Sequence, residues 1–353
     1  MTAELAARVR ILADDVTGAC DSGAAFLAAG HSVRVWFGAT PLFPAPETVQ
    51  AFHTASRYLA AGGAAEVVAR AAAGLERDGR TILFKKVDSA GRGLIAAEVL
   101  AAHRALGSKA ILFAPGFPAA GRTVRDGILE IRDACGQNTQ VSLPELFAPE
   151  MSEGIALVKT AAEVARAIEC GKTLLMCDSA TQDELNALAR AAEPLHELLY
   201  AGSAGLAQAI ASLHPAPAPD APAAAARRTL VIAGTPHPIT RLQLESLESA
   251  TRERQDARIL RIACEDGDEA KICSAFEAFE PDALILTGGD TAQMAADALG
   301  VHSILLRGEF APGIPWGRLE GGAAQGRIAV TKSGGFGSAG TLNEIVERLS
   351  GAA

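Results

Sequence analysis

Short β-like runs alternate with helix-like segments along most of this chain, and this alternation most constrains its fold. Between Val9 and Ala207 the runs are RVRILA, SVRVWF, TVQAFHT, TILFKK, KAILFA, TLLMCD and ELLYA, separated by stretches of helical period. Such alternation is typical of βαβ units, whose strands run parallel in one sheet. The sequence therefore predicts an α/β fold with largely parallel strands. One less regular stretch, Thr123 to Glu145, is predicted to form a hairpin or a flap.

A Pro/Ala-rich segment divides this pattern into two parts. Residues 214–228 begin with HPAPAPDAPAAAA, which has no periodicity and is typical of a semi-rigid linker. After the linker, the runs TLVIAG, ARILRIA, ALILTGG, SILLRGE and RIAVTK again alternate with helical segments. The 353 residues suffice for two domains of usual size. We therefore predict two α/β domains, residues 1–213 and 229–353, with the active-site cleft between them.

Composition and charge exclude several classes of protein. The net charge of −9 and the lack of a basic run argue against a nucleic-acid partner. The sequence has no run of 18 or more apolar residues, which a membrane-spanning helix would need. The N-terminus does not resemble a signal peptide. The 6 cysteines form no C-x-x-C pair, which favours reduced thiols over a disulfide framework or zinc site. We expect a cytoplasmic protein without a protein-built metal site.

The stretch ILADDVTGACDSG contains the first candidate site residues. Asp14 and Asp15 follow an apolar run and precede a helical segment, so they are predicted at the carboxyl end of a strand, where open α/β sheets bind ligands. The alternative is an N-capping aspartate with a solvated neighbour.

Two further runs are predicted to end at the same sheet edge. The sequence FKKVDSAGRG follows one of them, and its lysines and arginine are suited to a carboxylate or phosphate. A solvated loop of mixed charge is the alternative. The side chain of His53 either binds an acidic group or is a strand histidine whose hydrogen bonds are already made. The candidate substrate-binding residues are Ser56, Arg57, Lys85, Lys86, Val87, Asp88, Ser89 and Arg92.

Glycine-rich turns follow the strands of the second half. LTGGDT and TKSGGFGSAG each lie between a strand and a helix, where glycines let backbone N–H groups approach an anion. A simple capped turn is the alternative. The pattern G-x-G-x-x-G at Gly335 lacks the acidic residue about 20 positions later that a dinucleotide ribose needs, so a phosphate loop fits better. The candidate cofactor-binding residues are Gly234, Thr235, Gly288, Gly289, Asp290, Thr291, Lys332, Gly334, Gly335 and Gly337.

In their order along the chain, these motifs resemble those of the four-carbon acid sugar kinase family. The motifs are ADDVTGACDSG, SR, KKVDSAGRG, FAPGFPAAGRTVRDG, AGSAGLA, GTPHPIT, TGGDTA, PGIPWGRLEGG and TKSGGFGSAGTL. The resemblance implies an N-terminal domain that binds a four-carbon sugar acid, a C-terminal domain that binds ATP, and phosphorylation of a terminal hydroxyl. The chain departs from the family pattern at His53, Ala90-Gly91 and Thr235.

The resemblance also implies roles for the candidate residues. Arg57, Lys85 and Lys86 would hold the sugar acid, and Asp15, or else Asp14 or Asp88, would orient or deprotonate its hydroxyl. Mg²⁺ would bridge phosphate oxygens together with water and Asp290. The rival interpretations are an NAD-linked dehydrogenase and a non-catalytic sugar-acid-binding protein of the same fold. A homo-oligomer is compatible with the sequence.

Overall fold

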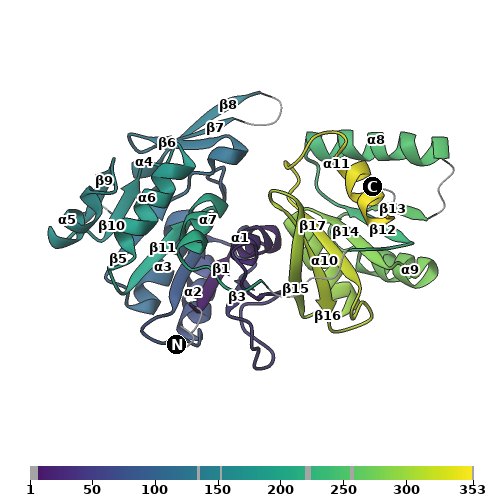
Figure 1. Cartoon of the computed structure of the whole chain (residues 1–353), viewed down its shortest axis with the longest axis horizontal. Helices are drawn as coiled ribbons and strands as arrows, with labels where there is room; N and C mark the ends of the chain where they lie inside the picture. Colours follow the sequence, from purple (N-terminus) through teal and green to yellow (C-terminus); the bar gives the residue numbers. More distant parts are fainter. Residues whose placement is uncertain (1–6, 133–135, 152, 219–223, 255–257, 352–353) are drawn as a thin grey trace. The chain divides into compact units, whose positions relative to one another are not determined.

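The computed structural model in Figure 1 describes residues 7–132, 136–151, 153–218, 224–254 and 258–351. The chain folds into two compact units. The first contains Met1–Val33 and Gly38–Pro219, and the second contains Arg34–Phe37 and Asp220–Ala353. Each unit is an α/β structure, which confirms the predicted fold class; the first sheet is parallel, whereas the second is parallel in one half and antiparallel in the other. Part of the predicted linker lies outside the described residues. Cys135 also lies outside them.

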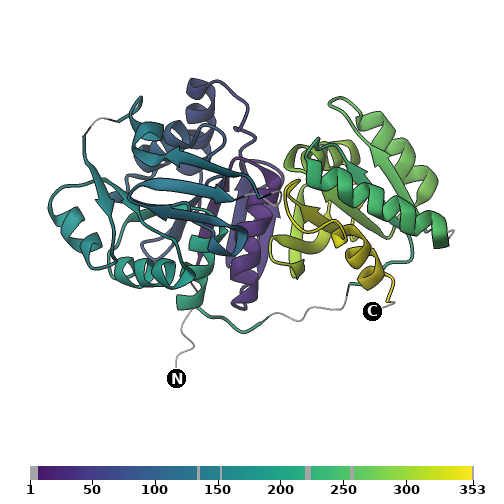
Figure 2. The same cartoon turned by 90° about the horizontal axis from the view of Figure 1, so that it is seen from above.

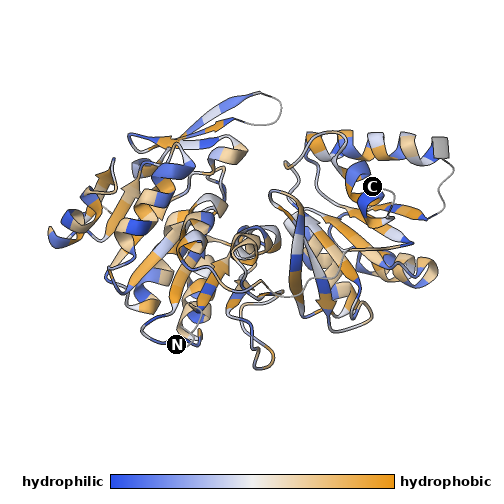
Figure 3. Ribbon diagram, viewed as in Figure 1, coloured by the Kyte–Doolittle hydropathy of each residue, from blue (hydrophilic) through white to orange (hydrophobic). Residues whose placement is uncertain are grey.

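The sheet of the first unit is parallel throughout. Its strands, in spatial order, are β3 (Val49–His53), β1 (Val9–Ala13), β4 (Ile82–Lys86), β11 (Leu198–Gly202), β5 (Ala110–Ala114), β10 (Leu174–Cys177) and β9 (Ile155–Val158). The central strands are apolar, as Figure 3 shows, because helices cover them on both faces. β9 is missing from the sequence prediction, since its four residues are too few to show a period.

Seven α-helices cover this sheet within the described residues. They are α1 (Val16–Ala28), α2 (Ala61–Ala73), α3 (Ile95–Leu106), α4 (Leu143–Phe147), α5 (Glu163–Glu169), α6 (Gln182–Ala192) and α7 (Ala204–Leu213). Helices α1, α6 and α7 pack together, and α2 packs on α3; Figure 2 shows the same sheet from above. Local signals start and stop these helices: Thr181 and Glu184 form a capping box at α6, and Gly107 ends α3 in the left-handed conformation.

The stretch with a predicted hairpin or flap forms a small antiparallel sheet. It contains β6 (Arg122–Arg125), β7 (Ile128–Arg132) and β8 (Asn138–Ser142), after the short 3₁₀ helix at Pro118–Ala120. The Asp178 carboxylate accepts hydrogen bonds from the amides of Asp126 and Gly127, at 3.1 and 3.4 Å, and so fixes the β6–β7 turn.

The second unit combines parallel and antiparallel strands. Their order is β13 (Ile259–Ala263), β12 (Thr229–Ala233), β14 (Ala283–Thr287), β17 (Ile328–Lys332), β16 (Ile314–Glu320), β15 (Ser303–Ala311) and β2 (Val33–Trp36). The first four are parallel, and the pairings from β17 to β2 are antiparallel. The helices are α8 (Pro238–Arg254), α9 (Glu269–Phe279), α10 (Gly289–Leu299) and α11 (Thr341–Leu349), and α8 packs on α11 while α9 packs on α10.

Two strands of this unit differ from the sequence prediction. β16 was not predicted, because Pro315 and Gly317 are poor strand formers; at Gly317 a Cβ would lie 2.3 Å from the Leu305 carbonyl oxygen. β2 comes from the N-terminal part of the chain, yet it pairs with β15 in the second unit. Arg34 fastens it by donating to Ser303 Oγ at 2.9 Å and by an ion pair with Glu320.

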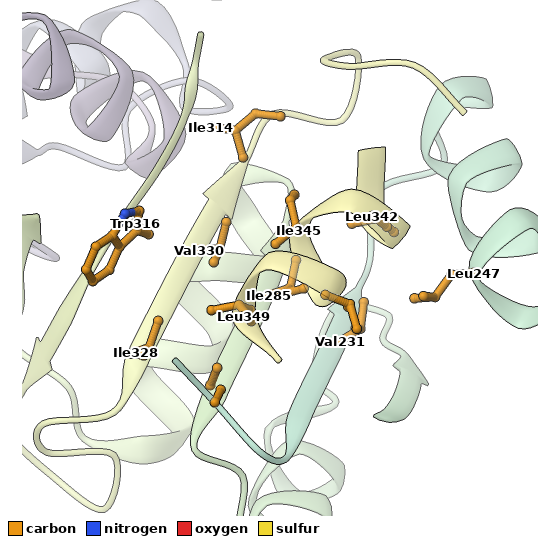
Figure 4. Close-up of a cluster of buried hydrophobic side chains, with 13 residues drawn as sticks. Val231, Leu247, Ile285, Ile314, Trp316, Ile328, Val330, Leu342, Ile345 and Leu349 are labelled. Atoms are coloured by element: carbon orange, nitrogen blue, oxygen red, sulfur yellow. The ribbon is translucent and has the colours of Figure 1, made fainter. Parts of the chain in front are cut away.

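A cluster of apolar side chains forms the core between the second sheet and α11 (Figure 4). Ile345, Leu342 and Leu349 of α11 lie against strand residues such as Ile285 and Val330. The labelled members are Val231, Leu247, Ile285, Ile314, Trp316, Ile328, Val330, Leu342, Ile345 and Leu349. None of the described helices is long and apolar enough to cross a membrane.

Truncation of this core should destabilise the second unit. Ile285→Ala removes a fully buried side chain, so we expect a loss of about 2–5 kcal/mol in unfolding free energy. Both tryptophans, Trp36 and Trp316, belong to this unit, so tryptophan fluorescence in urea reports its unfolding. Leu242→Ala, at a residue 47% exposed on α8, is the control and should leave the midpoint nearly unchanged. Equal midpoint shifts would contradict the assigned core.

Candidate functional site

The carboxyl ends of three neighbouring strands bring the acidic and basic candidates of the first unit together. Ala13, the last residue of β1, pairs with His53 of β3 on one side and with Lys86 of β4 on the other. The residues that follow each strand therefore emerge side by side at one edge of the sheet. Here lie the aspartates after β1, Arg57 after β3 and Asp88 after β4.

Arg57 is the centre of this edge, because it bridges three aspartates. Its Nε donates to Asp14 Oδ2 at 2.7 Å and its Nη1 donates to Asp15 Oδ2 at 2.8 Å. Its Nη2 lies 3.4 Å from Asp88 Oδ2. The four side chains are almost completely buried, with at most 11% of any of them exposed. One guanidinium thus holds three carboxylates together within a small volume.

The three aspartates differ in how many of their carboxylate oxygens accept hydrogen bonds. Asp15 caps α1, since its Oδ1 accepts from the Gly18 amide at 2.7 Å and its Oδ2 accepts from Thr17 Oγ1 at 3.0 Å. Asp88 binds both Nε and Nη2 of Arg92, at 3.1 and 2.6 Å. Asp14 Oδ1 is buried and has no hydrogen-bond partner. Buried polar atoms nearly always have a partner, so Asp14 differs from the other two aspartates in having an oxygen without one.

The surrounding cations keep two of the aspartates, Asp14 and Asp88, ionised. Burial opposes the charge of Asp14, but Arg57 and two lysines outweigh it and lower the pKa of Asp14. Burial likewise opposes the charge of Asp88, but its hydrogen bonds and ion pair with Arg92 lower its pKa well below the usual range. Burial also disfavours the charged form of Arg57, yet the carboxylates around it raise its pKa. Asp14, Asp88 and Arg57 are therefore charged at neutral pH.

The two lysines of this edge, Lys85 and Lys86, are buried next to the cluster. Lys85 is fully buried, and its Nζ lies 2.7 Å from Glu98 Oε2 on α3. Lys86 is buried too and donates to the Val87 carbonyl oxygen at 2.9 Å. At Gly18 an added Cβ would lie 3.2 Å from Lys86 Nζ, so this lysine packs directly against the first turn of α1. Lys85 is therefore placed to act through its neighbours and not by contact with a ligand.

The remaining candidates of the first unit differ in exposure. Ser56 and Val87 are buried, Ser89 is partly exposed, and 62% of the Arg92 side chain is exposed. Arg92 is thus the cation of this edge with most surface available to a ligand. His53 is buried at the end of β3.

Three strand ends also meet in the second unit. β12, β14 and β17 are neighbours, and the turns after them lie in contact. A Cβ at Gly234 would lie 2.6 Å from Thr291 Oγ1, and a Cβ at Gly334 would lie 2.6 Å from Thr235 Oγ1. Gly288 has a φ of +104°, which favours glycine. Only glycine therefore lets these turns approach so closely.

Most of the remaining candidates of the second unit lie in or next to these turns. Gly288 precedes α10, whose first turn carries Asp290 and Thr291. Thr291 is buried and Asp290 is exposed. Gly289 and Gly335 are partly exposed, while Gly337 is exposed. Backbone amides at a helix start and at glycine turns can bind an anion.

Lys332 differs from the other candidates because it lies inside the unit. It is completely buried, and its Nζ donates to the Ser333 carbonyl oxygen at 2.9 Å. Burial lowers the pKa of Lys332 to about 8. The structure thus places this lysine beneath the glycine-rich turn.

Several residues of both sites were not predicted from the sequence. Glu98 pairs with Lys85, His237 lies beside Gly335, and Thr240 and Gln243 of α8 hold the glycine-rich turn. The motif GTPHPIT contains His237 and Thr240 and was a usable signal. Glu98 and Gln243 lie inside helical stretches, where a polar residue normally indicates a solvated face.

No protein-built metal site is evident in the part of the chain that the structure describes, because no three His, Cys, Asp or Glu side chains there could hold an ion. The carboxylates of the first unit are held by arginine. An exposed aspartate, Asp290, stands beside the glycine turns of the second unit. A cation that is bound mainly by phosphate and water fits this arrangement.

Loss of Arg57 should destabilise the protein most at neutral pH. The pKa values of Asp14 and Asp88 are lowered by folding, so their stabilisation is present above about pH 4 and is lost as the pH falls further. Arg57→Met leaves buried carboxylates without this partner, and we expect a loss of about 3–5 kcal/mol at pH 7. The deficit should shrink towards pH 4, where the carboxylates can take up protons.

Urea unfolding followed by far-UV circular dichroism at pH 7 and at about pH 3.5 measures this effect. Lys109→Met, which removes an exposed ion pair with Glu197, is the matched control and should leave the midpoint unchanged. A deficit of Arg57→Met that does not vary with pH would contradict the assigned electrostatics.

Two family models match separate parts of the chain. A family model described as a sugar-binding N-terminal domain matches residues 9–210, and one described as a nucleotide-binding C-terminal domain matches residues 269–342. The D-threonate kinase of Bordetella bronchiseptica is 31% identical, with 97% of each chain covered. That of Salmonella typhimurium is 26% identical, with 94% of this chain and 96% of the relative covered.

Solved structures with the same fold are also similar along the whole chain. A Bordetella bronchiseptica protein with bound citrate, a domain-swapped dimer, is 29% identical with a TM-score of 0.51, and 98% of each chain is covered. A Haemophilus influenzae protein is 18% identical with a TM-score of 0.69, over 96% of this chain and 100% of the other. The match of the sugar-binding domain over more than half of the chain, with 31% identity to a relative, shows that the chain belongs to the four-carbon acid sugar kinase family.

Proposed function

We propose that this protein is an ATP-dependent kinase that phosphorylates a terminal hydroxyl of a four-carbon sugar acid. The observation that carries the proposal is the unpartnered, buried Asp14 Oδ1 within an arginine-held carboxylate cluster. Such an oxygen can accept a hydrogen bond from a substrate hydroxyl. The names of the relatives, D-threonate kinases, support a tetronate as the acceptor.

On the acceptor side, the charges of the first unit assign separate roles. Arg57 is occupied by three aspartates, whereas most of the Arg92 side chain is exposed. Arg92 is therefore the better group for the substrate carboxylate, which an arginine can bind through two nitrogens. Lys86 adds positive charge beneath the site. The hydroxyls of the sugar acid would then face the carboxylates.

Asp14 is the best candidate for the group that orients or deprotonates the acceptor hydroxyl. Asp15 uses both oxygens to cap α1 and bind Arg57, and Asp88 binds Arg92 and its own loop. Its low pKa makes Asp14 a weak base, which suits phosphoryl transfer because positioning contributes most of the catalysis.

On the donor side, the glycine turns of the second unit would bind the phosphates of ATP. Gly234, Gly288 and Gly334 allow close approach of the backbone, and α10 directs its N-terminus to the same edge. Mg²⁺, when bound, would neutralise charge on the phosphate oxygens. Asp290 would hold it through water.

The proposal predicts ADP formation with Mg-ATP and a tetronate. A coupled assay with a panel of four-carbon acids, including D-threonate, should give turnover with at least one of them. No ADP with any acid, together with ligand-dependent thermal stabilisation, would favour the sugar-acid-binding interpretation. Reduction of NAD⁺ by the same acids would favour the dehydrogenase.

Asp14→Asn should reduce kcat about 10²- to 10⁴-fold with little change in the KM for ATP, because the amide is a poorer acceptor for the hydroxyl proton. Asp15→Asn is the comparison, since its amide oxygen can still cap α1 and a smaller loss is expected. Steady-state kinetics at saturating acid measure both. A larger loss in Asp15→Asn would exchange the two roles.

A further inference from the structure

The glycine-rich turn of the second unit encloses a lysine that has no acidic partner. Lys332 is completely buried. It forms no ion pair with any residue that the structure describes. Its Nζ lies within 2.9 Å of the Ser333 carbonyl oxygen and 3.4 Å of those of Gly334 and Phe336. A buried ammonium is costly without a counter-ion, so its place here needs a reason.

Side chains of α8 hold the same turn from the same side. Thr240 Oγ1 donates to the Gly334 carbonyl oxygen at 2.8 Å. Gln243 Nε2 donates to the carbonyl oxygens of Phe336 and Ser338, at 3.0 and 2.8 Å. Together with Lys332, these donors draw the carbonyl groups of the turn towards the interior of the unit.

The inward carbonyls determine the direction of the amides. In a trans peptide the C=O and the following N–H point to opposite sides. Inward carbonyls at Ser333, Gly334 and Phe336 therefore direct the N–H groups of Gly334, Gly335 and Gly337 outward. No hydrogen bond described for the turn uses these three amides as donors. Such an array of amides is a concave site for an anion.

We propose that Lys332 is a positioning residue that holds the glycine-rich turn with its amides outward and supplies positive charge from beneath to the phosphates. This inference rests on the proposed ATP site. Lys332 acts through the turn, because its ammonium is enclosed by backbone carbonyls and has no surface for direct contact. A positive charge at this depth is little screened by salt.

The charge of Lys332 makes ATP binding sensitive to pH. Its pKa of about 8 means that the ammonium is present below pH 8 and is lost as the pH rises. The titratable groups on the surrounding elements are His237 before α8, Asp290 on α10 and Glu344 on α11. All three groups are still present in Lys332→Met, so a pH dependence that this variant loses comes from Lys332. Weaker ATP binding between pH 7.5 and 9.5 in wild type alone would therefore report Lys332.

The test is the Kd for Mg-ATP, measured by calorimetry on the full chain at pH 7.5 and 9.5. Lys332→Met should weaken ATP binding at least tenfold at pH 7.5, with the Kd for D-threonate unchanged. Wild-type affinity should fall towards that of Lys332→Met at pH 9.5, while the variant shows no further fall. Lys109→Met in the first unit is the matched control and should behave as wild type.

Thr240→Val extends the test if Lys332→Met does not fold. It removes the donor to Gly334 but leaves the lysine, so ATP affinity should weaken at both pH values and keep its pH dependence. Wild-type ATP affinity that is equal at pH 7.5 and 9.5, or unchanged ATP affinity in a folded Lys332→Met, would overturn the inference alone. Failure of wild type to bind Mg-ATP at any pH would overturn the proposed function and the inference with it.

Discussion

The bridging of three aspartates by Arg57 is the interaction on which the first site depends. Three carboxylates in a small buried volume repel one another, and only a cation with several donors in a fixed plane can hold them all. Arg57 comes from the end of β3, and two of its partners come from the end of β1. The arrangement thus needs parallel strands in register. The ion pairs of the site therefore form only if the strands of the first unit pair in this register.

Two buried lysines, Lys85 and Lys332, differ in their partners. Lys85 is neutralised by Glu98, so its charge costs little and its role is to support β4 and α3. Lys332 has backbone carbonyls as its partners. Carbonyl dipoles satisfy its hydrogen bonds without cancelling its charge, which leaves that charge available to an anion outside the turn.

The sequence predicted what repeats and missed what depends on partners distant in the chain. The alternation of runs was enough for the α/β class, and Asp14, Arg57 and Gly334 could be predicted to lie at sheet edges because each follows a strand-like run. The choice among the aspartates required coordinates, since only contacts reveal that Asp15 is used as a cap. β16 contains proline and glycine, which hide its strand character. Glu98 resembled a surface residue until its pairing with Lys85 was known.

The position of β2 in the second unit has a consequence for how the chain must fold. Arg34 and Ser303, which are hydrogen-bonded neighbours in the finished sheet, are separated by 269 residues. A ribosome releases β2 early, and this strand then has to wait for β15 before its edge is covered. Closing so large a loop is slow. Final assembly of the second unit is therefore a late event, because its sheet needs strands from both ends of the chain.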